Sequence, residues 1–147
     1  MSNSSFLSAK GDKVFKHQWN VLLASKDSEV ASSLLPVLRE FEFNGIVVNR
    51  GGDVLLTLLD LDFELIIIDA ELVGMSGDEI FPIVRRIRPK IPVIFVADNL
   101  SLEMGKELAQ NGILYRLSKP VNINEVRDIA TSFRNKLINT HSKLSYS

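Results

Sequence analysis

The sequence contains no cysteine among its 147 residues, which excludes disulfide cross-links, thiolate metal sites and cysteine nucleophiles. It also has no apolar run approaching the ~18 residues of a membrane-spanning helix. The N-terminus lacks the apolar segment of a secretory signal. We therefore expect a cytoplasmic protein that does not bind a membrane. With 46% hydrophobic and 24% charged residues, the composition predicts one globular domain with its own core.

The formal net charge of −1 is unevenly distributed along the chain. Residues 1–19 carry a balance of +2 and residues 134–147 a balance of +3, so the segment between them has a balance of −6. An acidic body argues against direct binding of nucleic acid, because phosphate contacts need a basic surface. We expect a folded body at residues 20–138 between flexible tails at 1–19 and 139–147.

Five short apolar runs are spaced through this body, and their unbroken apolarity is typical of parallel strands covered on both faces. The runs are Asn20–Ala24, Ile46–Val48, Leu65–Ile68, Ile91–Ala97 and Ile113–Leu117. Segments with helical spacing of apolar residues alternate with them: Ser28–Phe43, Asp53–Asp60, Asp78–Arg88, Asn99–Gln110 and Asn122–Ile138. Pro36 predicts a kink or a late start in the first helix. Five such units with right-handed crossovers predict a three-layer α/β sandwich, (βα)5, with a parallel sheet in the order 2-1-3-4-5.

Polar residues follow four of the predicted strands, at the sheet edge where this fold class places its functional crevice. They are Ser25-Lys26-Asp27, Asp69-Ala70-Glu71, Asp98 and Ser118-Lys119-Pro120. Asp69 directly follows a wholly apolar run, where an unpaired carboxylate would be costly, so it needs a cation, a hydrogen-bond donor or a raised pKa. Two interpretations remain open: a functional carboxylate, or a carboxylate that caps a helix or a loop.

The same positions carry a family resemblance. Residues 20–30, 65–77, 92–97 and 117–120 resemble, in order and spacing, the receiver domain of two-component response regulators, which has a CheY-like, flavodoxin-like fold. The resemblance covers residues 20–138. It implies that Asp69 is the phosphoacceptor position, that Lys119 contacts the phosphoryl group and that the bond before Pro120 is cis. Gly77 matches the glycine found eight residues after the aspartate.

Three features depart from the family pattern. The resemblance implies that phosphorylation needs Mg²⁺, bound by the aspartate, by an acidic pair after the first strand and by a carbonyl two residues past the aspartate. Here Ser25-Lys26 replaces the acidic pair. Ala97 replaces the hydroxyl residue after the fourth strand. Arg116 replaces the aromatic switch residue, and we expect it to be exposed to a partner or to solvent.

Lys26 determines the cofactor that we expect. An ammonium at the position of a metal ligand repels a divalent cation, which prefers oxygen ligands. The same ammonium would attract the Asp69 carboxylate strongly at close range. We predict that Lys26 and Lys119 hold Asp69 ionised in place of Mg²⁺, and that no metal binds; the alternative is that Lys26 points to solvent. If a metal does bind, we expect its ligands among Asp69, Glu71 and Asp27.

The predicted function is that of a degenerate receiver, not an enzyme, which acts without an attached output domain through phosphorylation-independent protein–protein interaction. Expected partners are signalling proteins such as a histidine kinase or another regulator. A homodimer could form through the face of the predicted helix 99–110, strand 113–117 and helix 122–138. The alternative is a conventional Mg²⁺-dependent receiver phosphorylated on Asp69 by a histidine kinase. A remote alternative is a phosphatase with Asp69 as its nucleophile.

Overall fold

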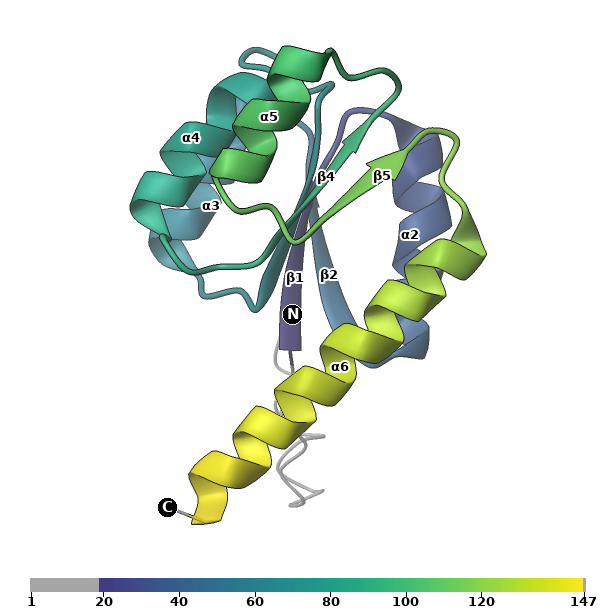
Figure 1. The fold of residues 1–147 in the computed structure, drawn as a ribbon, viewed down its shortest axis with the longest axis vertical. Coiled ribbons are helices and arrows are strands. Elements are labelled where there is room, and N and C mark those ends of the chain that lie inside the picture. The colour runs from purple at the N-terminus through teal and green to yellow at the C-terminus, as the bar shows by residue number, and fades with distance from the viewer. Residues whose placement is uncertain (1–18, 147) are drawn as a thin grey trace, which may run out of the picture.

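The computed structural model describes residues 19–146, with side chains described for residues 19–140. Its five strands pair in parallel and are ordered β2-β1-β3-β4-β5, as Figure 1 shows. They are β1 (Trp19–Ala24), β2 (Phe43–Val48), β3 (Leu65–Asp69), β4 (Val93–Ala97) and β5 (Tyr115–Ser118). The predicted fold class and strand order are confirmed.

Five helices cover the two faces of the sheet. They are α2 (Ser28–Glu40), α3 (Gly51–Asp60), α4 (Gly77–Ile87), α5 (Leu102–Gln110) and α6 (Ile123–Tyr146). Helices α2 and α6 pack on one face, and α3, α4 and α5 pack on the other. Each face therefore has its own apolar core, and every residue of β3 and β4 is buried between them. Burial on both faces explains the unbroken apolar runs of these strands.

Helix α2 differs from the prediction at Pro36. It begins at Ser28 and continues through Pro36 to Glu40 as one helix, so the predicted late start is wrong. The proline cannot donate a hydrogen bond to the carbonyl of Ser32. Both residues lie on the exposed side of the helix, where water can bond to that carbonyl.

Both predicted boundaries of the folded body need correction. Trp19, predicted to belong to the N-terminal tail, is the first residue of β1 and is buried against Phe43, with 6.0 Å between their ring centroids. Residues 1–18 of that tail lie outside the described residues. Helix α6 runs to Tyr146 instead of ending at Ile138, so most of the predicted C-terminal tail continues the helix (Figure 1).

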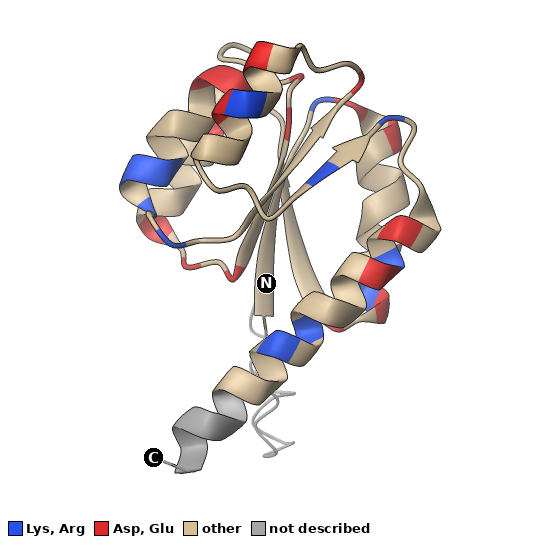
Figure 2. Cartoon of the chain, viewed as in Figure 1, with Lys and Arg blue, Asp and Glu red and all other residues tan. Residues whose placement is uncertain are grey.

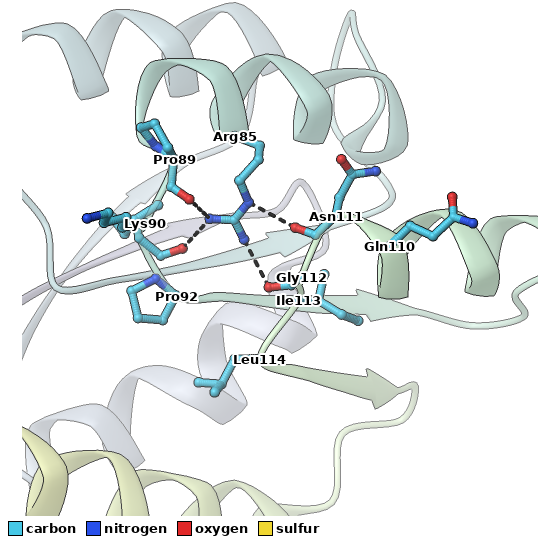
Figure 3. Close-up of a pocket in the computed structure, with 10 residues that line it drawn as sticks. Arg85, Pro89, Lys90, Pro92, Gln110, Asn111, Gly112, Ile113 and Leu114 are labelled. Carbon is cyan, nitrogen blue, oxygen red and sulfur yellow. Dashed lines mark hydrogen bonds between the residues drawn. The ribbon is translucent and has the colours of Figure 1, made fainter.

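Arg85 of α4 joins two loops at the edge of the sheet where strands begin. Its guanidinium donates hydrogen bonds to four backbone carbonyls, which belong to Pro89 (3.2 Å), Ile91 (2.6 Å), Asn111 (3.0 Å) and Gly112 (3.1 Å). Figure 3 shows this group in a depression of about 620 Å³. The contacts hold the turn before β4 against the turn before β5, and so fix where the edge strand begins.

The loop after β3 is tied to both neighbouring loops at the opposite edge of the sheet. The Lys26 amide donates to the Glu71 carbonyl (3.2 Å), and the Gly51 amide donates to the Val73 carbonyl (3.0 Å). The loop also approaches α4 closely, because a Cβ at Gly77 would lie 2.2 Å from the Asp69 carbonyl oxygen. Glycine is therefore required at position 77, because a side chain there would overlap the backbone of Asp69. Within the described part of the chain, no helix is long and apolar enough to cross a membrane.

Candidate functional site

Asp69 ends β3 at this edge, and its side chain is 0% exposed. Three groups of the chain itself bind its carboxylate. The Ser25 hydroxyl donates to Oδ2 at 2.6 Å, and the Lys119 ammonium lies 2.9 Å from the same oxygen. The backbone amide of Glu71 donates to Oδ1 at 3.0 Å. Asp69 therefore has the hydrogen-bond and cation partners that a buried carboxylate requires.

Ser25 is the partner of Asp69 that sequence reasoning missed. Its hydroxyl donates to Asp69 and accepts a hydrogen bond from the Asp27 amide at 2.9 Å, so it connects the ends of β1 and β3. The parallel register that pairs Ala24 with Ile68 places the next residue of each strand side by side. A predicted β1–β3 pairing was thus the signal that could have identified Ser25.

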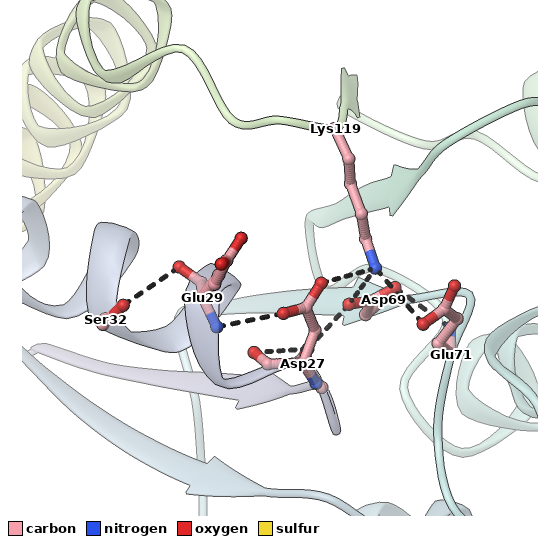
Figure 4. Close-up of polar contacts among 7 residues, drawn as sticks. Asp27, Glu29, Ser32, Asp69, Glu71 and Lys119 are labelled. Carbon is pink, nitrogen blue, oxygen red and sulfur yellow. Dashed lines mark hydrogen bonds and ion pairs between the residues drawn. The ribbon is translucent and has the colours of Figure 1, made fainter.

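Lys119 follows β5 and reaches across the sheet edge to three carboxylates, as Figure 4 shows. Besides Asp69, its Nζ lies 3.2 Å from Oδ2 of Asp27 and 3.7 Å from Oε1 of Glu71. Its side chain is only 8% exposed. This burial by itself lowers the pKa of Lys119, but the hydrogen bonds and negative charges of the three carboxylates outweigh it and raise the pKa overall. The ammonium is therefore held charged at the centre of the site.

Asp27 has two roles at the start of α2. Its Oδ1 accepts the amide of Glu29 at 2.9 Å and caps the helix, while its Oδ2 binds Lys119. The backbone hydrogen bond from Glu29 lowers the pKa of the Asp27 carboxyl, and the hydrogen bond from Lys119 lowers it further. The sequence offered Asp27 as a conditional metal ligand, and the structure shows it as an ion-pair partner of Lys119.

Lys26 does not meet the prediction made for it. Its side chain is exposed, and no ion pair joins it to Asp69 among residues 19–140. Successive residues at the end of a strand point to opposite sides, so a chain that turns Ser25 toward Asp69 turns Lys26 away from it. The predicted Lys26–Asp69 ion pair is corrected: Ser25 and Lys119 bind this carboxylate.

The arrangement of a buried aspartate after β3 and a lysine after β5, in a sheet of order 2-1-3-4-5, is matched by known proteins. Residues 21–131 match the family described as the response regulator receiver domain. This chain belongs to that family. It is thus a receiver domain of a two-component system, and receiver domains in general accept a phosphoryl group and are not enzymes.

Individual relatives are distant. The chain is 24% identical over 123 residues to the transcriptional regulatory protein ZraR of Escherichia coli K12; the match covers 84% of this chain but 27% of ZraR. This receiver domain therefore spans about a quarter of the length of the curated relatives it matches.

Solved receiver domains share the fold of this chain. A CheY-like receiver domain protein from Methanospirillum hungatei superposes with a TM-score of 0.73 at 23% identity, covering 86% of this chain and 99% of that one. A receiver protein from Pseudomonas putida gives 0.72 at 18% identity, covering 80% of this chain and 99% of that one.

Three other positions of the receiver pattern lie in β4, in β5 or in the loop after β5. Ala97 is buried at the end of β4 and brings no hydroxyl to this edge of the sheet. The Lys119–Pro120 peptide bond is cis. Arg116 is exposed on β5, and its guanidinium lies beside α5, where a Cβ at Gly105 would be 3.8 Å from Nη1.

The side chains at this edge do not fit Mg²⁺ in the family manner. Both oxygens of Asp69 are already bound by Ser25, Lys119 and the Glu71 amide. The Glu71 carbonyl accepts the Lys26 amide. In residues 19–140, no group of three or more His, Cys, Asp or Glu side chains has an arrangement that could hold a metal ion. The lysine ammonium lies among the carboxylates that would otherwise be available as hard oxygen ligands.

Proposed function

We propose that this receiver domain is degenerate and signals through protein–protein contacts, without Mg²⁺-dependent phosphorylation of Asp69. One observation carries the proposal: the Asp69 carboxylate is fully buried and already bound by Ser25, Lys119 and the Glu71 amide. Attack on a phosphoryl group through Oδ2 would break the hydrogen bond from Ser25. Here the partners are fixed groups of the chain, held by β1, β5 and the loop after β3.

Electrostatics supports the same conclusion. A carboxylate that attacks an anionic phosphoryl group needs cations to neutralise the charge that develops. The single ammonium of Lys119 is shared among Asp69, Asp27 and Glu71, so its positive charge is already outweighed by three carboxylates before a phosphodonor arrives. Ala97 offers no hydroxyl to the transferred group. The site is therefore suited to hold the loops together.

The partners that we propose are other signalling proteins: a histidine kinase, another regulator or a second copy of this chain. The surface formed by α5, β5 and α6 would carry these contacts, and its exposed residues include Arg116 and Tyr115. Nucleic acid is not among the proposed ligands, because the body of the chain carries a negative balance. We place this function in the cytoplasm, without a metal cofactor.

A conventional receiver is the second candidate, and the Asp69–Lys119 contact favours it. The 2.9 Å separation keeps the two residues that a phospho-receiver uses in direct contact. In that case phosphorylation of Asp69 by a histidine kinase would break the hydrogen bond from Ser25. Mg²⁺ would then have to displace the Lys119 ammonium from the carboxylates.

One phosphorylation experiment separates the candidates. The chain is incubated with acetyl phosphate and Mg²⁺, and its intact mass is measured before and after, beside Asp69→Asn. We expect no added phosphoryl group. A gain of one phosphoryl mass that Asp69→Asn abolishes would show a conventional receiver and refute the proposal.

A variant with the acidic pair restored is the matched positive control. In Ser25→Asp/Lys26→Asp, position 25 supplies a carboxylate beside Asp69, and the neighbouring ammonium of residue 26 is replaced by a second carboxylate. We expect Mg²⁺ to raise the melting temperature of this variant and to leave that of the natural chain unchanged. Isothermal titration with Mg²⁺ should likewise show binding only to the variant. Equal Mg²⁺ binding by the natural chain would contradict the proposal.

A further inference from the structure

A groove of about 310 Å³ lies between the edge strand β5 and α6. Leu114 and Tyr115 form one wall, and Ile129 and Phe133 of α6 contribute apolar surface to the other. Leu114 and Tyr115 are 41% and 39% exposed, so this apolar surface is open in the described part of the chain. The groove is separate from the Asp69 site and plays no part in its chemistry.

The far end of this groove is acidic. Glu125 and Asp128 line it, and the Tyr115 hydroxyl donates a hydrogen bond to Glu125 at 2.7 Å. Lys136 contributes the one basic side chain to the lining, at the opposite end. Figure 2 shows the acidic residues of α6 near its start, with basic residues both among them and farther along. An apolar surface that ends in two carboxylates fits a segment with an apolar anchor and basic side chains.

The chain enters its fold next to this groove. Trp19, the first described residue, lies under the guanidinium of Arg134 of α6, 5.9 Å from the centre of its ring. Phe43 bridges Trp19 and Phe133, and its ring centroid is 6.1 Å from that of Phe133. Phe133 also lines the groove. Trp19, where the described chain begins, is therefore linked to the groove through Phe43 and Phe133.

The sequence before Trp19 has the matching chemistry. Residues 10–16 read Lys-Gly-Asp-Lys-Val-Phe-Lys, with an apolar Val14-Phe15 pair and three lysines against one aspartate. We propose that this segment of the same chain docks in the β5–α6 groove, with Val14-Phe15 against Ile129 and Phe133, and Lys10 and Lys13 toward Asp128 and Glu125. This proposal does not depend on the state of Asp69.

The distances permit this docking within one chain. The starts of β1 and β5 share one edge of the sheet, three strand spacings of about 4.8 Å apart. The register across the sheet places Tyr115 level with Leu23. Leu23 lies four residues beyond Trp19 along β1, so Trp19 and Tyr115 are roughly 20 Å apart. Six extended residues span about the same distance, so Lys13 reaches the acidic end while Phe15 reaches Phe133.

Docking would make the segment a regulator of partner binding. The groove belongs to the α5–β5–α6 surface proposed above for protein contacts, and the segment would cover its apolar part. A partner that uses this surface must displace the segment first. Its apparent affinity would then be lower for the natural chain than for a chain whose segment cannot dock.

Paramagnetic labelling of the full chain tests the proposal. Because the sequence has no cysteine, Ser8→Cys introduces a single site for a nitroxide label. We expect strong broadening of the Leu114 and Ile129 methyl signals in NMR spectra. The Lys10→Glu/Lys13→Glu variant should reduce this broadening several-fold, because the reversed charges repel Glu125 and Asp128. High salt should weaken it as well.

Matched variants distinguish the outcomes. Lys90→Glu/Lys106→Glu makes the same charge change at exposed lysines elsewhere and should leave the broadening intact. Glu125→Lys/Asp128→Lys should restore broadening to the Lys10→Glu/Lys13→Glu chain. Broadening that persists unchanged in Lys10→Glu/Lys13→Glu overturns the proposal. Broadening that falls on dilution with unlabelled protein, together with a concentration-dependent dimer in sedimentation, would place the segment in a second copy and overturn docking within one chain.

Discussion

The carboxyl end of β3 and the edge strand β5 lie in the same sheet but have opposite surroundings. At the end of β3, Asp69 is enclosed, and each of its oxygens is bound by a group of the chain. On β5, Tyr115 and Arg116 are exposed beside an open groove. The aspartate that matches the family's phosphorylation site lies at the end of β3, whereas the surface that we propose for partners lies at β5.

The difference shows that the two places have different structural constraints. A buried carboxylate with good partners stabilises the loops that it joins, and removal of any partner leaves an uncompensated charge. An exposed edge strand has no such constraint, so its residues can change to suit a partner. Under the function proposed above, Asp69 would join the loops at this edge without being phosphorylated.

The largest expected effect comes from Lys119→Met. This substitution leaves the buried Asp69 carboxylate without its cation, and we expect it to lower the free energy of unfolding by about 3–5 kcal/mol at pH 7. Urea unfolding measures the loss. Adding Asp69→Asn to Lys119→Met should recover part of it. A cost below about 1 kcal/mol for Lys119→Met would show that the ion pair is not the main support of the site.

Gly77→Ala should have the next largest effect. The new Cβ would overlap the Asp69 carbonyl, which is backbone and cannot move without shifting the end of β3. We expect a loss of about 2–3 kcal/mol in the free energy of unfolding. Gly52→Ala is the control, because a Cβ there meets nothing within 4 Å. It should leave stability unchanged or raise it by up to about 1 kcal/mol, since alanine favours a helix.

Ser25→Ala tests whether the hydroxyl or the neighbouring ammonium supports Asp69. Loss of a hydrogen bond to a buried carboxylate should cost about 1.5–3 kcal/mol. Lys26→Ala removes an exposed side chain and should change stability by less than about 0.5 kcal/mol. Thermal and urea unfolding of the two variants measure both values. The reverse order of effects would reinstate Lys26 as the partner of Asp69.

The smallest effect is expected from Asp27→Asn, and it should depend on pH. Asparagine still caps α2, so this change removes mainly the charge that binds Lys119. The pKa of Asp27 is lowered in the fold, so the ion pair adds stability above the unfolded value near 3.8 and loses it as pH falls below that value. The stability difference between the natural chain and Asp27→Asn should therefore be full at pH 7 and shrink toward pH 3. A constant difference over this range would contradict the assignment.

The raised pKa of Lys119 makes stability depend on pH in the opposite direction from Asp27. Its ion pairs add stability below the unfolded value near 10.5 and lose it as pH rises through the folded value. The difference in the free energy of unfolding between the natural chain and Lys119→Met should therefore be full at pH 7 and shrink as pH rises above 10.5. Urea unfolding of both proteins at pH 7 and above pH 10.5 measures this difference.

Much of the fold could be predicted from local sequence. The apolar runs identified all five strands, and the polar residues after them identified the functional edge with Asp69 and Lys119. The ends of elements were harder to predict. The run at Ile46–Val48 did not reveal that β2 begins at Phe43, and Ile138 did not end α6. Such boundaries depend on packing against other elements as well as on the residues at the ends.

The site was predicted less well than the strands that form it. Lys26 was expected beside Asp69 because family position and charge both favoured it. Ser25 was overlooked, although its burial and its 2.6 Å contact make it a direct partner of the carboxylate. A shift of one residue at the end of a strand reverses which side chain faces inward, and charge alone does not indicate that direction.

The sequence by itself determined the order of the strands and the position of Asp69 at their carboxyl edge, because unbroken apolar runs separated by helical segments have few ways to pack. Only the tertiary structure decided which groups bind that carboxylate. Ser25 and Lys119 are 44 and 50 residues from Asp69 along the chain, and they meet it because parallel pairing aligns the ends of β1, β3 and β5. Where each side chain points there is fixed by register and burial, which the whole fold sets.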